Sequence, residues 1–84
     1  MILELDSLTM ESVADMKQQF KGEYSEIEAI KINNFIDSSG LGILIEIAKF
    51  KIKNENKKLL IKGLTDVQKS IINLSKLDEL FDIE

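Results

Sequence analysis

One junction constrains the fold of this chain more than any other feature. An alternating apolar segment runs through Asp37-Ser38-Ser39-Gly40 into a long apolar segment. The alternation of Ile30-Lys31-Ile32 predicts a strand over residues 27–35, because successive side chains of a strand point to opposite faces. The next segment predicts a helix from Ser38 or Ser39 to about residue 53. Asp and Ser suit a helix start because their side chains accept hydrogen bonds from its unpaired N–H groups.

The N-terminal part of the chain predicts a second strand and helix. Residues 1–5 predict a short strand that ends at Asp6 and Ser7. Residues 9–21 predict a helix with Thr9 as its N-cap and Gly22 as its stop.

The C-terminal part continues the same order. A polar turn is expected at residues 54–57, a short buried strand at 58–62 and an edge strand at 81–83. Between these strands, a capping-box pattern from Thr65 to Gln68 opens a last helix, with Val67, Ile71 and Leu74 on one face. Alternating strands and helices predict an α/β fold in a single domain over residues 1–84, with a mainly parallel four-stranded sheet and about three or four helices.

Composition excludes several classes of function. Histidine and cysteine are both absent, which removes Ser-His-Asp triads, thiol nucleophiles and the commonest metal ligands. A net charge of −4 argues against a nucleic-acid partner, since such proteins present a basic face. No apolar run reaches the length needed to cross a membrane, so no direct membrane insertion is expected. We therefore expect a cytoplasmic binding protein that is not an enzyme and uses no cofactor.

The helix after the serines carries apolar residues on two sides. One stripe is expected to face the sheet and comprises Leu41, Leu44, Ile45, Ala48 and Ile52. A second stripe points roughly the opposite way and comprises Ile43, Ile47 and Phe50. Either neighbouring helices cover the second stripe, or it is an exposed patch that marks a protein-binding surface. The end of this helix carries lysines that suit the negative pole of its dipole, namely Lys49, Lys51 and Lys53.

The run Asp37-Ser38-Ser39-Gly40-Leu41-Gly42, between an Ile-rich strand and an apolar helix, resembles the signature of STAS domains. The likeness is to bacterial anti-sigma factor antagonists, also called anti-anti-sigma factors. Glu4-Leu5-Asp6 is similar to the segment that precedes their first helix, and residues 71–81 resemble their closing helix and turn. The resemblance therefore covers nearly the whole chain and implies a small STAS-like fold, from which the family's N-terminal strand is missing.

The resemblance implies a partner-switching pathway that regulates transcription. Ser38 would be phosphorylated by an anti-sigma factor that is itself a serine kinase; the unmodified protein binds this kinase, and the phosphoprotein is released. A protein phosphatase would restore the unmodified form. Asp37 would shape the loop, Gly40 would let the backbone of the partner approach, and Asp6 would lie on a loop that flanks the docking surface. The full set of expected partner-binding residues is Asp6, Asp37, Ser38, Ser39, Gly40, Leu41, Ile43, Ile47 and Phe50.

Two other interpretations stay open at this point. Short STAS proteins also serve as accessory subunits of a bacterial ABC transporter that maintains lipid asymmetry, where they bind its cytoplasmic ATPase. The serines also suit a purely structural role, because Asp37 and Ser38 can form an Asx turn while Ser39 caps the helix. The structural and regulatory roles are compatible, since Ser39 can cap while Ser38 faces outward. A homodimer is also left open.

Overall fold

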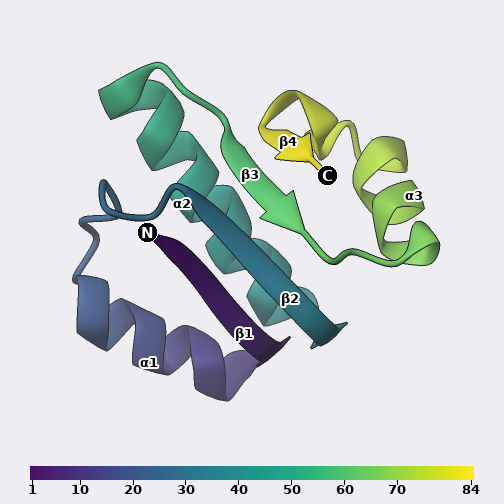
Figure 1. The fold of residues 1–84 in the computed structure, drawn as a ribbon, viewed down its shortest axis with the longest axis horizontal. Helices are drawn as coiled ribbons and strands as arrows, with labels where there is room; N and C mark the ends of the chain where they lie inside the picture. The colour runs from purple at the N-terminus through teal and green to yellow at the C-terminus, as the bar shows by residue number, and fades with distance from the viewer.

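The computed structural model describes residues 1–84 as a four-stranded parallel sheet in the order β1-β2-β3-β4, with three α-helices and one short 3₁₀ turn (Figure 1). The α/β class and the parallel sheet predicted from the sequence are confirmed. In chain order the elements are β1 (Ile2–Leu8), α1 (Met10–Phe20), β2 (Ala29–Ile36), α2 (Ser38–Glu55), β3 (Leu59–Lys62), α3 (Asp66–Leu74), η1 (Leu77–Glu79) and β4 (Phe81–Ile83).

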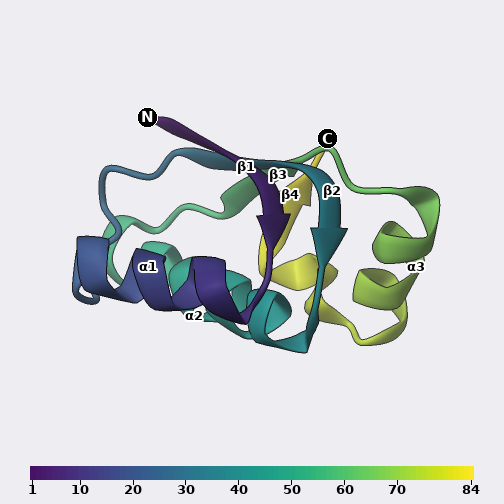
Figure 2. The same ribbon diagram turned by 90° about the horizontal axis from the view of Figure 1, so that it is seen from below.

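All of the helices lie on one side of the sheet (Figure 2). The strands are neighbours in the order in which the chain makes them, so each right-handed crossover moves in the same direction and places its helix on the same face. The other face carries charged side chains in register, among them Glu4 beside Lys31 and Lys31 beside Lys62. The polar positions of the alternating pattern therefore lie on the face of the sheet that no helix covers.

The long helix α2 lies centrally beneath the sheet, with α1 on one side of it (Figure 1). Leu44 and Ala48 of the expected sheet-facing stripe are fully buried, Leu41 and Ile45 are half-buried, and Ile52 at its end is exposed, contrary to the prediction. Ile43 and Ile47 are also buried, because the face that carries them packs into the same core as Met16 of α1. The second stripe of α2 is thus covered by its neighbours, and the alternative of an exposed patch there is wrong.

Several predicted boundaries and faces need correction. β1 continues to Leu8, so Asp6 lies within the strand and not on a loop. The face of α3 that carries Val67, Ile71 and Leu74 is exposed, and Ile72 is the residue of that helix that enters the core. The capping box of Thr65 and Gln68 is confirmed. A helix can show an apolar face to solvent as readily as to a core, because periodicity says only which residues share a face.

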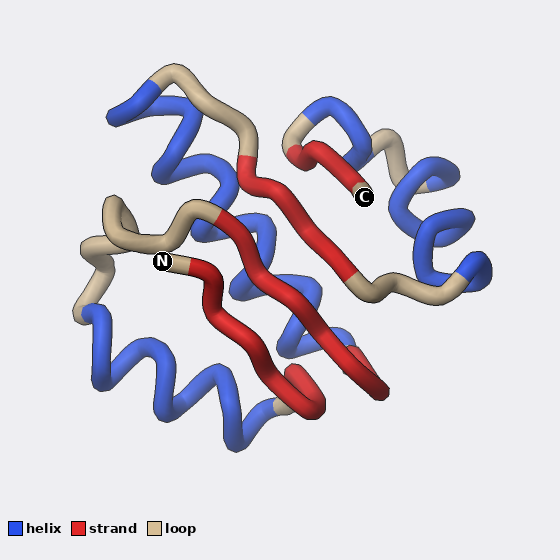
Figure 3. Tube along the Cα trace, viewed as in Figure 1, coloured by secondary structure: helices blue, strands red, loops and turns tan.

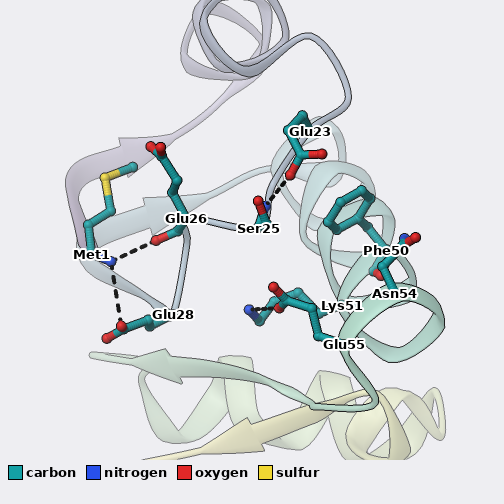
Figure 4. A network of polar contacts seen from close by, with 9 residues as sticks. All are labelled: Met1, Glu23, Ser25, Glu26, Glu28, Phe50, Lys51, Asn54 and Glu55. Carbon is teal, nitrogen blue, oxygen red and sulfur yellow. Dashed lines mark hydrogen bonds and ion pairs between the residues drawn. The ribbon is translucent and has the colours of Figure 1, made fainter.

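A network of polar contacts lies at the amino ends of β1 and β2, away from the junction of β2 and α2 (Figure 4). The N-terminal ammonium donates to the Glu26 carbonyl at 2.6 Å and lies 3.9 Å from the Glu28 carboxylate. A hydrogen bond from the Ser25 side chain, and then one from its backbone N–H, hold the pKa of Glu23 below its usual value. These groups are paired with one another and form a structural cluster. No group of side chains suited to holding a metal ion occurs in the chain.

The same network includes one buried charge. Lys51 of α2 is buried and its Nζ lies 2.6 Å from Oε1 of Glu55, one turn further along the helix (Figure 4). A buried ammonium group is tolerated only when a partner and hydrogen bonds compensate it. Glu55 therefore makes the burial of Lys51 possible.

Candidate functional site

Asp37 is the single residue between β2 and α2, where the tube runs from strand into helix (Figure 3). Its extended backbone places it as the N-cap of α2, and its Oδ1 accepts a hydrogen bond from the Gly40 N–H at 2.8 Å. Its Oδ2 accepts a second bond, at 3.2 Å, from the N–H of Met10, the first residue of α1. One carboxylate therefore caps two helices, and it lies where the positive ends of both helix dipoles meet.

The start of α1 combines a local cap with this long-range contact. Thr9 occupies the N-cap position, as predicted, and forms a capping box with Ser12, although its side chain accepts no close cap hydrogen bond. The Thr9 N–H reaches only Ser12 Oγ, at 3.5 Å. Asp37, 27 residues away from Met10 in sequence, supplies the acceptor for the first N–H of the helix, that of Met10.

Gly40 is needed for a close approach within the chain. A Cβ atom at this position would lie 2.2 Å from the Leu8 carbonyl oxygen and 3.0 Å from Leu8 Cγ. The first turn of α2 therefore packs directly on the backbone at the end of β1, and the Asp37 N–H donates to that same carbonyl at 3.1 Å. Because Gly40 is buried against β1, the expectation that it makes room for the backbone of a partner is wrong.

Ser38 is exposed and is the first residue of α2. It lies on the rim of a groove of about 230 Å³ between the start of α2 and the helix α3. The groove is lined mostly by apolar side chains: Ile36, Leu41, Ile71 and Ile72, together with Asp37, Ser38 and Gln68. We call this the Ser38 groove. A hydroxyl thus lies beside an apolar depression that no other part of the chain fills.

Ser39 faces a different depression. It lines a wider groove of about 500 Å³ between α1 and α2, with Met10, Val13, Ala14, Lys17, Gly42, Ile43 and Glu46. We call this the α1–α2 groove. Gly42 is exposed there, and a Cβ atom on it would meet nothing within 4 Å. The two adjacent serines therefore line two separate grooves. The sequence had predicted a single site that contains both.

The groove between α1 and α2 ends near a buried tyrosine. The hydroxyl of Tyr24 donates to Glu46 Oε2, and its ring packs edge-on against Phe50 with centroids 5.6 Å apart. Burial, and secondly the hydrogen bond to Glu46, raise the pKa of the Tyr24 phenol to about 12. These two contacts hold the loop before β2 against α2. Phe50, which was expected to bind a partner, therefore packs against Tyr24 within the fold.

Exposed apolar residues gather near the Ser38 groove. Met10, Phe35 and Val67 each lie within five residues of the carboxyl end of a strand, and they are 70%, 55% and 69% exposed. Ile71 and Leu74 continue the exposed face of α3. In parallel sheets this edge is the usual place for ligands and partners, because the loops that follow the strands meet there. We call Val67, Ile71 and Leu74 the α3 stripe.

The structure brings together only some of the expected site residues. Asp37, Ser38 and Leu41 meet at the Ser38 groove, and Ser39 lies beside it in the other groove. Asp6 is exposed on the helix-free side of the sheet, where its Oδ1 accepts a bond from Asn34 at 2.5 Å. Ile47 is buried in the core. The α3 stripe was missed as a site feature, although its spacing in the sequence was recognised.

The Ser38 groove joins an apolar surface to a helix start. Besides Asp37, whose carboxylate is held by two N–H groups, no ionisable side chain lines the Ser38 groove. The helix start can instead accommodate an anion, because the N–H groups of Ser38 and Ser39 precede the first intrahelical bonds.

No protein-family model matches this sequence, and a search of curated proteins finds no significant relative. No helix of the structure combines the length and apolar character that a membrane crossing requires.

Proposed function

We propose that this chain is a cytoplasmic, non-enzymatic anti-sigma factor antagonist, which binds an anti-sigma serine kinase through the Ser38 groove and the α3 stripe and is released when Ser38 is phosphorylated. The observation that carries the proposal is the position of Ser38, exposed at a helix start beside an apolar groove. The sequence resemblance indicates the kind of partner, and the Ser38 groove with the α3 stripe is the surface that we propose it binds.

The proposed switch is local. The kinase transfers the γ-phosphoryl group of ATP to Ser38 Oγ; the Oγ–P bond forms, ADP leaves, and the hydroxyl proton passes to a base of the kinase. A phosphatase hydrolyses the ester with water and returns inorganic phosphate. Phosphoserine carries about −1.5 to −2 charges near neutral pH, which the start of α2 can accommodate within the free protein.

The same charge is costly inside an interface. A partner that packs on Ile71 and Leu41 would have to desolvate the phosphate next to an apolar groove. An uncompensated buried charge costs several kcal/mol, which corresponds to a loss of about a thousandfold in affinity. We therefore expect release without unfolding of the domain.

The proposal is tested with tagged protein expressed in its host, from which bound partners are isolated and identified. We expect a serine kinase bound to the unmodified protein, phosphate incorporated at Ser38 in the presence of ATP, and no phosphate in Ser38→Ala. Ser38→Asp should lose the kinase, whereas Ser25→Asp, with the same charge change at the amino edge of the sheet, should keep it. Equal phosphorylation of Ser38→Ala, or full binding by Ser38→Asp, would refute the proposal.

The α3 stripe also fits the second candidate, an accessory subunit of the lipid-asymmetry ABC transporter. Leu74 is 85% exposed and lies beyond the groove residues, so an apolar contact there does not require Ser38 to change state. This function predicts an ABC ATPase as the isolated partner, and binding that Ser38→Asp leaves intact. The two functions are thus separated by the same experiment.

A further inference from the structure

The Asp37 carboxylate links the phosphorylation site to a second helix. Its Oδ1 accepts from Gly40 in the first turn of α2, and its Oδ2 accepts from Met10 at the start of α1. Both bonds use the oxygens of one planar group, so the carboxylate cannot leave Gly40 without also changing its bond to Met10. Ser38 is the residue next to this carboxylate.

We propose that Asp37 transmits the charge state of Ser38 to the first turn of α1, so that phosphorylation changes the α1–α2 groove as well as the Ser38 groove. The inference rests on the proposed function, because it takes Ser38 as the phosphorylated residue. It adds a second surface, on the other side of α2, that reports the modification.

The coupling follows from competition between two anions. The phosphate of Ser38 and the carboxylate of Asp37 both seek the N–H groups at the start of α2, and their like charges repel each other. Phosphate carries more charge and more acceptor oxygens than the carboxylate, so it takes the N–H groups of this turn. Asp37 then moves away from Gly40, and Met10 loses its acceptor.

The start of α1 has a capping box formed by Thr9 and Ser12, but the acceptor of the Met10 N–H is Asp37. The capping box is loose: the Thr9 side chain accepts no close cap hydrogen bond, and Ser12 Oγ, which donates to the Ser7 carbonyl at 2.8 Å, accepts from the Thr9 N–H at 3.5 Å. Loss of Asp37 therefore weakens the first turn of α1, which carries Met10 and Val13. Both of these residues line the α1–α2 groove, so the shape of that groove depends on the cap.

The test compares amide hydrogen exchange in the full chain with serine or phosphoserine at position 38, the latter introduced during translation. The readout is the Val13 amide, which donates to the Thr9 carbonyl at 2.9 Å in the first turn of α1. The internal control is the Lys69 amide, which makes the equivalent 2.9 Å bond to Thr65 in α3. We expect phosphoserine to speed Val13 exchange about tenfold, the equivalent of one hydrogen bond, and to leave Lys69 within about twofold.

A double-mutant cycle identifies Asp37 as the link. Asp37→Asn keeps a cap for α2, because Asn is a good N-cap, but its amide nitrogen cannot accept from Met10. We expect Asp37→Asn to speed Val13 exchange by itself, and phosphoserine to add less than about twofold in that background. A further tenfold increase there, or Val13 exchange that phosphoserine leaves unchanged in the parent, would overturn the inference.

These outcomes are separate from those that test the proposed function. Partner release with unchanged Val13 exchange would refute the coupling and keep the switch at Ser38. Faster Val13 exchange without partner release would keep the coupling and refute the switch. Because the exchange measurement uses the free protein, it needs neither the kinase nor its identity.

Discussion

The same substitution at two glycines of α2 should change stability in opposite directions. Gly40 and Gly42 lie two residues apart in one helix, so alanine has the same intrinsic advantage at both, up to about 1 kcal/mol over glycine. Their surroundings differ completely. A Cβ atom on Gly40 would lie 2.2 Å from the Leu8 carbonyl oxygen, whereas one on Gly42 would meet nothing within 4 Å.

The magnitudes follow from these distances. An ordinary contact requires α2 to move about 1 Å from the end of β1, and such overpacking costs about 1–3 kcal/mol. The movement also strains the bond from Asp37 N–H to the Leu8 carbonyl, worth about 1 kcal/mol. After subtraction of the helix advantage, we expect Gly40→Ala to lower the free energy of unfolding by about 2 kcal/mol. Gly42→Ala should gain about 0.5–1 kcal/mol, since nothing opposes its helix advantage.

Urea denaturation of the parent and the two variants measures both effects, with thermal unfolding as a second probe. In a domain of this size a loss of about 2 kcal/mol lowers Tm by about 10 °C, and the gain at Gly42 raises it by about 4 °C. A Gly40→Ala variant as stable as the parent would show that α2 does not need this close approach. A Gly42→Ala variant that loses stability would show that the α1–α2 groove is filled in the free protein.

Three further predictions concern polar contacts. Asp37→Ala should lower the free energy of unfolding by about 2 kcal/mol because two helices lose a cap, and Asp37→Asn by about half as much; urea denaturation compares them. The raised pKa of Tyr24 means that folding favours the neutral phenol, so the contribution of Tyr24 to stability is constant below about pH 10 and is lost as the pH rises to about 12. Ultraviolet titration of this single tyrosine measures its pKa directly, and Glu46→Gln should lower that pKa. Glu55→Ala should lower the free energy of unfolding by about 3 kcal/mol, because it leaves the buried Lys51 ammonium without a partner. Lys51→Met should have a free energy of unfolding within about 1 kcal/mol of the parent. Equal losses in the two variants would contradict this account.

A separate prediction concerns the α3 stripe. Leu74→Ser should leave the free energy of unfolding within about 0.5 kcal/mol, since the side chain is 85% exposed, but it should weaken partner binding. Ile2→Ser is the matched control, because Ile2 is 56% exposed at the amino edge of the sheet. The two variants are compared by titration against the isolated partner. Equal binding by both would exclude the α3 stripe from the interface.

Local patterns were enough to predict the order of elements. Alternation at Ile30-Lys31-Ile32, the capping box of Thr65 and the serines after β2 are signals carried by a few neighbouring residues, and each marks an element in the structure. The parallel sheet followed from this order, because consecutive βαβ crossovers leave few other arrangements.

The surroundings of each helix could not be predicted in the same way. Ile43 and Val67 both belong to apolar helical stripes, yet Ile43 is 2% exposed and Val67 is 69% exposed. Lys51, near the end of a lysine-rich helix, was expected to stabilise the helix dipole and is instead buried with Glu55. Which stripe is covered depends on where neighbouring elements pack, and this information is spread over the whole chain.

The bond between Asp37 and Met10 shows the same limit at the site itself. An aspartate before Ser-Ser-Gly predicts a local cap for α2, and that cap is present. The second bond exists because β1 and β2 are adjacent and parallel, so that the helices following them start side by side. Only the sheet register brings the two helix starts to one carboxylate.

The helix-free face of the sheet explains why a partner should approach at the carboxyl edge. Parallel sheets are ordinarily covered on both faces, but here one face carries Glu4, Lys31 and Lys62 in register, and Lys62 Nζ lies 3.5 Å from Glu84 Oε1. Burying these charges in an interface would require partners for each of them. The most exposed of the large apolar side chains, those of Met10, Val67 and Leu74, lie instead near the carboxyl edge and along α3. In the proposed function, a protein that makes apolar contact with this edge meets the Ser38 hydroxyl on the rim of the Ser38 groove, and we expect a charge added there to weaken its binding.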